Sequence, residues 1–285
     1  MKILHISDLH FEGTSYEEFY TGVRENLDKI RKELIDLTVD FMIVTGDLTT
    51  RGCVDKASLL QAKEWLDSIK IPYISIPGNH DTGANESRSK TYPDLEYYEP
   101  VPFSNTNFGQ LFKQPPVIEK NMGEFIIIGI VLRENDPDGA LTTLAKLLNH
   151  TSKPVLLFGH YPVVQARETG ILATFGYDES IPKTATELRR IIKEHSNVKV
   201  YACGHIHANT VRKIKDSCIQ VSTGGLGPGP SVFRIYNIAD GILSFKTYLG
   251  AGPLDFWHRF DTVYSYTAEY HLGAARERSG YIQFK

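Results

Sequence analysis

Residues 2–10 read Lys-Ile-Leu-His-Ile-Ser-Asp-Leu-His, an apolar run that ends in two side chains able to bind a metal, Asp8 and His10. A short run rich in branched apolar residues is typical of a β-strand, so we expect Lys2–Ile6 to form one. In extended backbone, side chains two positions apart point to the same face. The stretch therefore predicts a buried strand whose carboxyl end brings Asp8 and His10 to one site.

Five more apolar runs repeat this arrangement. Each is short and rich in Ile, Val, Leu or Phe, and each is followed by a turn or loop that contains glycine. Such nearly continuous hydrophobicity is typical of strands buried on both faces, as in a sheet covered by helices. The runs are Asp40–Thr45, Pro72–Ile76, Phe125–Leu132, Pro154–Phe158 and Val198–Ala202.

Amphipathic segments lie between these runs. Apolar residues recur at helical spacing in residues 23–34, 59–69 and 141–148, which predicts three helices with one buried stripe each. Thr184 and Glu187 have the spacing of a capping box ahead of another apolar stripe, so we expect a fourth helix to begin there.

After residue 207 the pattern changes to successive short strands. Residues 239–241 read Ala-Asp-Gly, which is typical of a hairpin turn. An α/β part followed by an antiparallel run predicts the α/β class and a four-layer αββα sandwich, with two mixed β-sheets packed face to face and flanking helices. The strands expected here are 211–214, 218–222, 231–238 and 242–248.

Two aromatic stretches fall outside these elements. We expect residues 1–250 to form the main domain, with 83–118 as a lid or substrate-loop insertion, because long aromatic loops often serve binding. The aromatic extension 251–285 is expected to pack on the body or on a second subunit, so a homo-oligomer is one expected arrangement.

Composition narrows the classes of partner. A net charge of −3 and a pI of about 6.4 give no support to nucleic-acid or membrane-surface binding, which needs clustered basic residues. The longest apolar run, Phe125–Leu132, is far shorter than the roughly 18 residues of a membrane-spanning helix. A cleaved leader within this chain would remove the motif that begins at Asp8, so we expect a cytoplasmic protein.

Five short segments share one property: each places Asp, Asn or His just past a predicted strand, where ligands bind in α/β sheets. A ligand set of carboxylate, imidazole and amide oxygen suits divalent Mn, Fe or Zn. The remaining histidines are expected to be structural or solvent-facing, and His5 to be buried beside the site. The segments are Asp8-Leu9-His10, Gly46-Asp47, Gly78-Asn79-His80-Asp81, Gly159-His160 and Gly204-His205-Ile206-His207.

This ordered set, DLH, GD, GNHD, GH and GHIH, resembles the signature of the calcineurin-like metallophosphoesterases and spans residues 8–207. The resemblance implies two divalent metal ions, with Asp47 bridging them through its two oxygens. It implies that one ion is held by Asp8, His10, Asp47 and His207, and the other by Asp47, Asn79, His160 and His205.

The resemblance also implies how the reaction proceeds. A water or hydroxide on the metals is the expected nucleophile. His80 matches the histidine of the family that does not bind metal and that stabilises charge on phosphate or protonates the leaving group. Asp81 is expected to orient His80, so these two residues are the predicted catalytic pair.

The stretch after Asp47 indicates the substrate class. Thr50 stands where the protein Ser/Thr phosphatases of the superfamily carry an acid before Arg-Gly, and residues 48–52 lack the tyrosine ligand of purple acid phosphatases. The chain looks more similar to compact bacterial and archaeal phosphodiesterases of the cyclic nucleotide or glycerophosphodiester type. We therefore expect small phosphodiester substrates, held by residues 83–118 and 161–183, with a phosphomonoesterase or nucleotide phosphatase as the alternative.

Two further functions are less consistent with the sequence. A nuclease should carry a basic stripe for phosphate contacts, but the longest basic runs are pairs such as Arg31-Lys32. A non-catalytic interaction module with this fold would lack the catalytic histidine, whereas His80 and the whole ligand set are present. A small-molecule phosphoester is therefore the expected partner.

Overall fold

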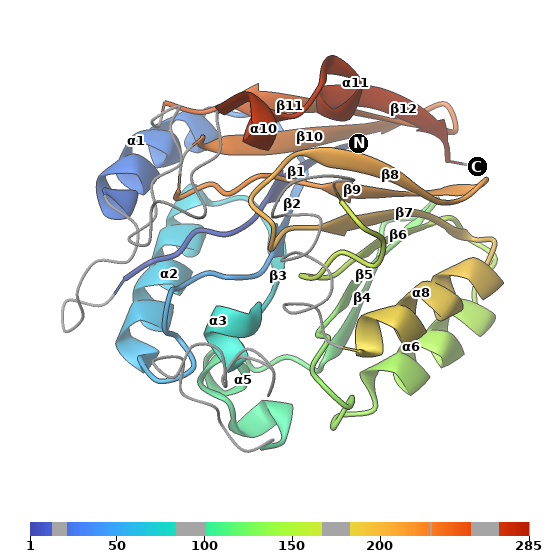
Figure 1. Ribbon diagram of the computed structural model, residues 1–285, viewed down its shortest axis with the longest axis horizontal. Helices are drawn as coiled ribbons and strands as arrows, with labels where there is room; N and C mark the ends of the chain where they lie inside the picture. The colour runs from blue at the N-terminus through green and yellow to red at the C-terminus, as the bar shows by residue number, and fades with distance from the viewer. Residues whose placement is uncertain (13–21, 84–100, 167–182, 229, 252–267, 285) are drawn as a thin grey trace.

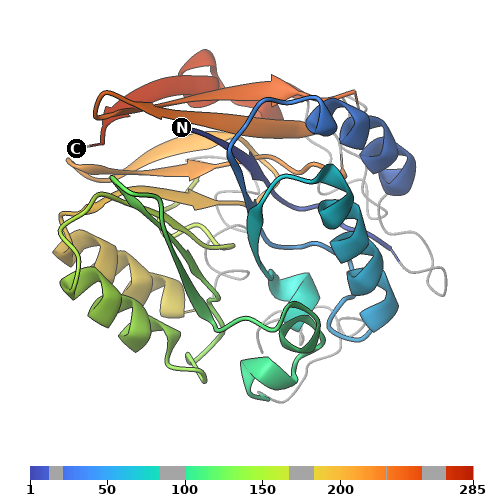
Figure 2. The same cartoon turned by 180° about the vertical axis from the view of Figure 1, so that it is seen from behind.

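The computed structural model describes residues 1–12, 22–83, 101–166, 183–228, 230–251 and 268–284. Within these ranges, two six-stranded mixed sheets pack face to face. Helices α1 and α2 cover the outer face of one sheet, and α6 and α8 cover the outer face of the other (Figures 1 and 2). The predicted four-layer αββα sandwich is confirmed.

The first sheet joins the start of the chain to its end. Its strand order is β12-β11-β10-β1-β2-β3, with β1, β2 and β3 parallel to one another and β10, β11 and β12 antiparallel to their neighbours. These strands are β1 (Lys2–Ile6), β2 (Phe41–Thr45), β3 (Tyr73–Ile76), β10 (Val232–Ala239), β11 (Ile242–Leu249) and β12 (Ser279–Gln283).

The second sheet has the order β4-β5-β6-β7-β9-β8. Its four inner strands run parallel, and an antiparallel strand lies at each edge. The strands are β4 (Val117–Asn121), β5 (Ile126–Ile130), β6 (Val155–Phe158), β7 (Val198–Cys203), β9 (Cys218–Ser222) and β8 (Thr210–Lys215). Every residue of β2, β5 and β6 is buried, as expected for strands covered on both faces.

The outer helices bury the predicted apolar stripes. They are α1 (Val23–Ile35), α2 (Lys56–Ile69), α6 (Ala140–Asn149) and α8 (Thr184–Glu194). The capping box predicted for α8 is wrong, although the helix begins where expected. Lys183 occupies the N-cap without a side-chain cap bond, and the Thr184 hydroxyl instead donates to the Arg133 carbonyl. A bond to a neighbouring loop has replaced the local one.

Part of the stretch expected to form a lid belongs to the body. Phe103–Asn105 forms a 3-10 helix (η1), and α5 (Asn107–Phe112) follows it. Phe103 and Phe108 are buried in the main core. The aromatic residues Tyr92, Tyr97 and Tyr98 lie outside the described residues, so a lid remains a prediction for 84–100.

The end of the chain is similarly divided. Residues 252–267 lie outside the described part, but α10 (Ala268–Leu272), α11 (Ala275–Arg278) and the edge strand β12 follow. In Figure 1, α11 lies beside β11 and β12. No helix in the described ranges is long and apolar enough to cross a membrane.

Candidate metal centre

The five predicted segments converge at the carboxyl ends of β1, β2, β3, β6 and β7. Main-chain hydrogen bonds continue past the strand ends, because Asp8 N–H donates to Gly46 O and His10 N–H donates to Asp47 O. The two sheets meet where His205 N–H donates to the Asp8 carboxylate, at 3.2 and 3.1 Å from its two oxygens. The site is therefore assembled between both sheets.

Two groups of ligand atoms result, and within each group the atoms lie within 4.8 Å of one another. The first contains Asp8, His10 and His207. Its Nε2 atoms of His10 and His207 are 3.0 Å apart, and His207 Nε2 lies 3.4 Å from Asp8 Oδ1. The structure thus unites residues almost 200 positions apart in the chain.

The second group contains Asp47, His160 and His205, with Asn79 beside it. His160 Nε2 lies 3.2 Å from Asp47 Oδ2, 3.2 Å from Asn79 Oδ1 and 3.1 Å from His205 Nδ1. His160 Nδ1 donates to the Thr45 carbonyl at 2.7 Å, which turns Nε2 toward the group.

Asp47 lies between the two groups. Its Oδ2 atom is 3.2 Å from His160 Nε2 and 3.9 Å from His10 Nε2, while Oδ1 accepts a hydrogen bond from His80 N–H at 2.9 Å. One carboxylate therefore faces imidazoles of both groups, which is the placement required of a bridging ligand.

The residues present fit a pair of divalent ions. Bonds of about 2.1 Å keep ligand atoms roughly 3.0–3.4 Å apart in octahedral or tetrahedral geometry, and the separations between neighbouring donors within each group match that spacing. Nitrogen and oxygen donors without thiolate suit borderline or hard cations. The ordered set of motifs and the two groups together indicate a dinuclear divalent metal centre.

The electrostatics of the site favour a cation. Burial alone raises the pKa of Asp47, but the imidazoles of His160 and His80 outweigh it and hold that pKa well below its ordinary value. Burial lowers the pKa of His160, whereas the Asp47 carboxylate raises it, with a net rise to about 9. Asp47 is therefore anionic at neutral pH, so the site offers a negative charge to a bound cation.

Most of the predicted ligands have a left-handed backbone, contrary to the extended geometry expected from the spacing. Asp8, His10, Asp47, His205 and His207 have φ angles between 49° and 73°. That conformation costs an ordinary residue about 1–2 kcal/mol, and such strain gathers where function requires a fixed geometry. Asp8 and His10 do converge, as do His205 and His207. They converge through tight turns after the strands and not because alternate side chains of a strand share one face.

Glycine allows two of these turns to pack closely. A β-carbon on Gly78 would overlap the Asp47 carboxylate, and one on Gly204 would overlap Ser7 Oγ and lie 2.6 Å from Asp8 Oδ2. Any other residue at these positions would displace a ligand.

His80 and Asp81 lie on the short helix α3 (Asn79–Thr82), where both are buried. His80 Nδ1 donates to the Thr50 carbonyl at 2.8 Å. The His80 and His10 rings pack edge-on, with 5.1 Å between their centroids. The Asp81 carboxylate accepts N–H bonds from Gly78, Leu48 and Thr49, and a hydroxyl bond from Thr49. Asp81 thus holds the loop after Asp47, while the Thr50 carbonyl orients His80.

Two histidines complete the surroundings of the centre. His5 is buried, as expected, with Nε2 2.9 Å from Thr45 Oγ1 and Nδ1 2.9 Å from the Tyr236 hydroxyl. His271 is expected from the sequence to be structural or solvent-facing. It is buried, and its Nδ1 donates to the His207 carbonyl at 2.9 Å. No local pattern marks His271, since its partner lies 64 positions away.

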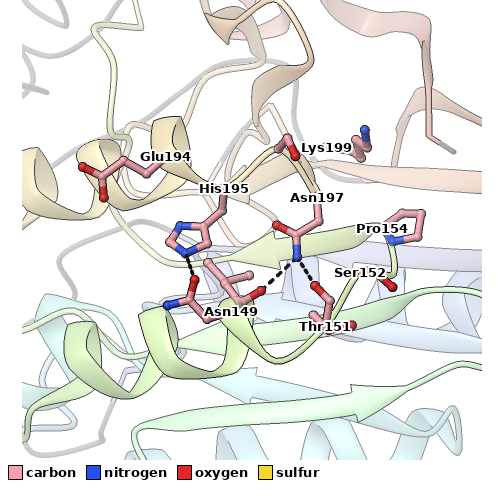
Figure 3. Close-up of a pocket in the computed structure, with 10 residues that line it drawn as sticks. Asn149, Thr151, Ser152, Pro154, Glu194, His195, Asn197 and Lys199 are labelled. Atoms are coloured by element: carbon pink, nitrogen blue, oxygen red, sulfur yellow. Dashed lines mark hydrogen bonds between the residues drawn. The ribbon is translucent and has the colours of Figure 1, made fainter.

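A separate hollow lies at the opposite end of the strands of the second sheet, where α6 and α8 end and β6 and β7 begin (Figure 3). The Asn197 amide donates to the carbonyls of Leu148 and Thr151, and His195 Nε2 lies 3.2 Å from Asn149 Oδ1. These bonds satisfy the last carbonyls of a helix and the loop after it, a structural role distinct from the metal centre.

Comparison with known proteins gives a consistent result. A sequence model of the family described as calcineurin-like phosphoesterase matches residues 1–209. A probable cyclic nucleotide phosphodiesterase of Vesicomyosocius okutanii is 27% identical over 72% of this chain and 78% of its own length. A probable glycerophosphodiester phosphodiesterase GpdQ of Arcobacter nitrofigilis is 27% identical over 59% of this chain and 56% of its own.

The fold has solved counterparts. The crystal structure of a dimetal phosphatase from Danio rerio covers 100% of this chain and 99% of its own, with a TM-score of 0.59 and 12% identity. At that identity the likeness concerns the fold.

Proposed function

The chain belongs to the calcineurin-like phosphoesterase family, and from that premise we propose that this metal-dependent phosphoric ester hydrolase acts on small phosphodiesters of the cyclic nucleotide or glycerophosphodiester type. The observation that carries the chemistry is the position of Asp47 between the two groups of ligands. The phosphodiester preference is supported by the two relatives described above, which are named as phosphodiesterases.

In this proposal each metal has four protein ligands. Two divalent ions, when bound, supply positive charge to the phosphate oxygens and lower the pKa of a water molecule. The chain provides their positions through ligands held by main-chain bonds and tight turns. One set is Asp8, His10, Asp47 and His207, and the other is Asp47, Asn79, His160 and His205.

His80 is the proposed catalytic residue that does not bind metal. Its Nδ1 proton is engaged by the Thr50 carbonyl, so exchange of a proton with the substrate falls to Nε2. At that atom the ring can stabilise charge on phosphate or protonate the departing alcohol. Asp81 acts through Asp47, because its bonds hold the backbone of residues 48 and 49, and is therefore proposed as a positioning residue.

The finer properties of the protein are proposed alongside. We propose Mn, Fe or Zn as the metals, a cytoplasmic location, and the segments within 83–118 and 161–183 as the stretches that hold substrate. Residues 1–250 form the proposed main domain, and 251–285 pack on the body or on a second subunit. The described end of that extension supports packing on the body, because β12 pairs with β11.

The test compares bis(p-nitrophenyl) phosphate with p-nitrophenyl phosphate on protein reconstituted with Mn. We expect a higher kcat/KM for the diester, and Asp47→Asn serves as the control that lowers both values. A preference for the monoester would overturn the diester assignment and favour a phosphomonoesterase or nucleotide phosphatase. Hydrolysis of neither ester by metal-loaded protein would contradict the proposed activity toward small phosphoesters.

A further inference from the structure

The short helix α10 lies against the loop that carries His205 and His207. Three hydrogen bonds join them: His271 Nδ1 donates to the His207 carbonyl at 2.9 Å, and the Asn209 backbone N–H and side-chain amide donate to the His271 carbonyl at 2.7 and 3.3 Å. His271 is only 2% exposed. A residue near the end of the sequence therefore holds the carbonyl of a predicted metal ligand and the residue two positions after it.

Apolar packing supports the same contact. Ile206 and Ala208, the neighbours of His207, form a small buried cluster with Ala166, and Tyr270 packs against it. Residues 206 and 208 are thus fixed by apolar packing in this cluster, and residues 207 and 209 by hydrogen bonds to His271 of α10.

The segment is also anchored to both sheets. The carbonyl of Glu277 in α11 accepts from Arg234 Nη1 at 2.9 Å, and Arg234 Nη2 donates to the Ser222 carbonyl at 2.8 Å. Arg234 is fully buried on β10, whereas Ser222 ends β9 of the other sheet. The Glu277 side chain pairs with Arg212 at 3.1 Å. The segment that follows His271 is therefore anchored to both sheets.

His207 needs such support because its backbone is strained. With a φ angle of 50°, it keeps its conformation only if its surroundings determine it. Its carbonyl is held by His271, and the following loop is fixed where Asn209 Oδ1 accepts a hydrogen bond from Gly224 N–H at 3.2 Å. Together these bonds set the direction in which the His207 ring projects toward Asp8 and His10.

We propose that His271 is a positioning residue of the metal centre: by holding the His207 carbonyl it preassembles the site formed by Asp8, His10 and His207. The inference rests on the proposed function in taking His207 as a ligand. It assigns a role to a segment outside the residues that the family model matches, which end at 209. His271 touches neither substrate nor metal in this role.

The test measures metal binding by two variants of the full chain. His271→Phe keeps a ring of similar size but removes the donor, and His271→Asn keeps an N–H near the position of Nδ1. After chelator treatment, each protein is titrated with Mn²⁺ and monitored by calorimetry and by the electron paramagnetic resonance of coupled Mn pairs. We expect the Phe variant to bind at one site about tenfold or more weakly and to lose the coupled signal, and the Asn variant to keep both.

A merely structural role would lower thermal stability in both variants and leave the coupled signal intact, and that outcome would overturn the proposal. If His271→Phe does not fold, His271→Leu is measured in its place with the same expectation. His195→Phe is the matched control, since it removes a similar bond from a histidine Nδ1 to a backbone carbonyl, that of Ile191, without touching His207 or the anchor of α11, and its Mn²⁺ affinity should equal that of the wild type. Failure of the wild type itself to bind two Mn²⁺ would count against the proposed function instead.

Discussion

The ring of His80 is oriented by the main chain of Thr50, whose carbonyl oxygen accepts a hydrogen bond from His80 Nδ1 at 2.8 Å. This bond selects the tautomer in which Nδ1 carries the proton of the neutral ring. It also connects the proposed catalytic histidine to the loop that follows Asp47, so the position of His80 depends on the same turn that presents the proposed bridging carboxylate.

Replacement of His80 should separate chemistry from metal binding. We expect His80→Ala to retain its metal content and to lose turnover by about 10²–10⁴-fold, the usual scale for a positioned acid or base. Elemental analysis and kcat on a diester provide the two measurements. Loss of metal by this variant, or full activity, would remove His80 from its proposed role.

Replacement of Asp47 should affect both metals together. Asp47→Asn removes the charge that faces His10 and His160 at once, so the affinities of the two sites should fall in parallel. His205→Ala is the comparison, because His205 belongs to one group alone. A titration in which Asp47→Asn weakened a single site would show that Asp47 does not bridge.

Asp81→Asn tests the positioning of the Asp47 loop. The carboxylate accepts from three backbone N–H groups and one hydroxyl, and an amide would turn its own N–H groups toward some of these donors. We expect a loss of about 1–3 kcal/mol in the free energy of unfolding, together with weaker metal binding. Denaturant unfolding of metal-free protein measures the first. Unchanged stability would mean that these bonds do not hold the loop.

The pH dependence of stability should report the buried His5. Burial, and to a smaller degree the charge of Arg234, hold the pKa of His5 well below its ordinary value. Below about pH 6.5 the unfolded chain binds a proton at this position that the folded chain does not. Stability is therefore lost as the pH falls, by up to roughly 1.4 kcal/mol per pH unit from this residue.

His5→Asn cannot titrate, so its free energy of unfolding should fall less steeply with decreasing pH than that of the wild type. Both proteins are compared without metal, by denaturant unfolding at several pH values between about 7 and 5. Equal slopes would show that His5 is protonated in the folded state.

Much of the fold could be predicted because its central strands are buried on both faces. Runs such as Phe41–Thr45 and Val155–Phe158 consist almost entirely of apolar residues, so their composition alone predicts burial. The edge strands β4 and β12 do not: only Val117 of β4 is fully buried, and none of β12 is. Their pairing depends on a neighbour elsewhere in the chain, which no local pattern reveals.

The candidate ligands could be named from the order of the motifs and their place after the strands, and the structure brings them together. The contacts that support them could not be predicted. His205 and His207 adopt left-handed backbone conformations, which a sequence usually signals with glycine. Here the residues are histidines, and tertiary contacts impose the conformation. The hydrogen-bond partners of Asp81 (residues 48 and 49) and of His271 (residue 207) are likewise distant in sequence, so only the folded structure identifies them.

The most direct test of the two-metal phosphoesterase is a titration of chelator-stripped protein with Mn²⁺, following bound metal and hydrolysis of bis(p-nitrophenyl) phosphate in the same samples. The geometry of Asp47 between the two groups predicts two Mn²⁺ per chain at saturation, with full activity regained only as the second ion binds. Binding of one ion or fewer at saturation, or hydrolysis that survives complete removal of metal, would contradict it.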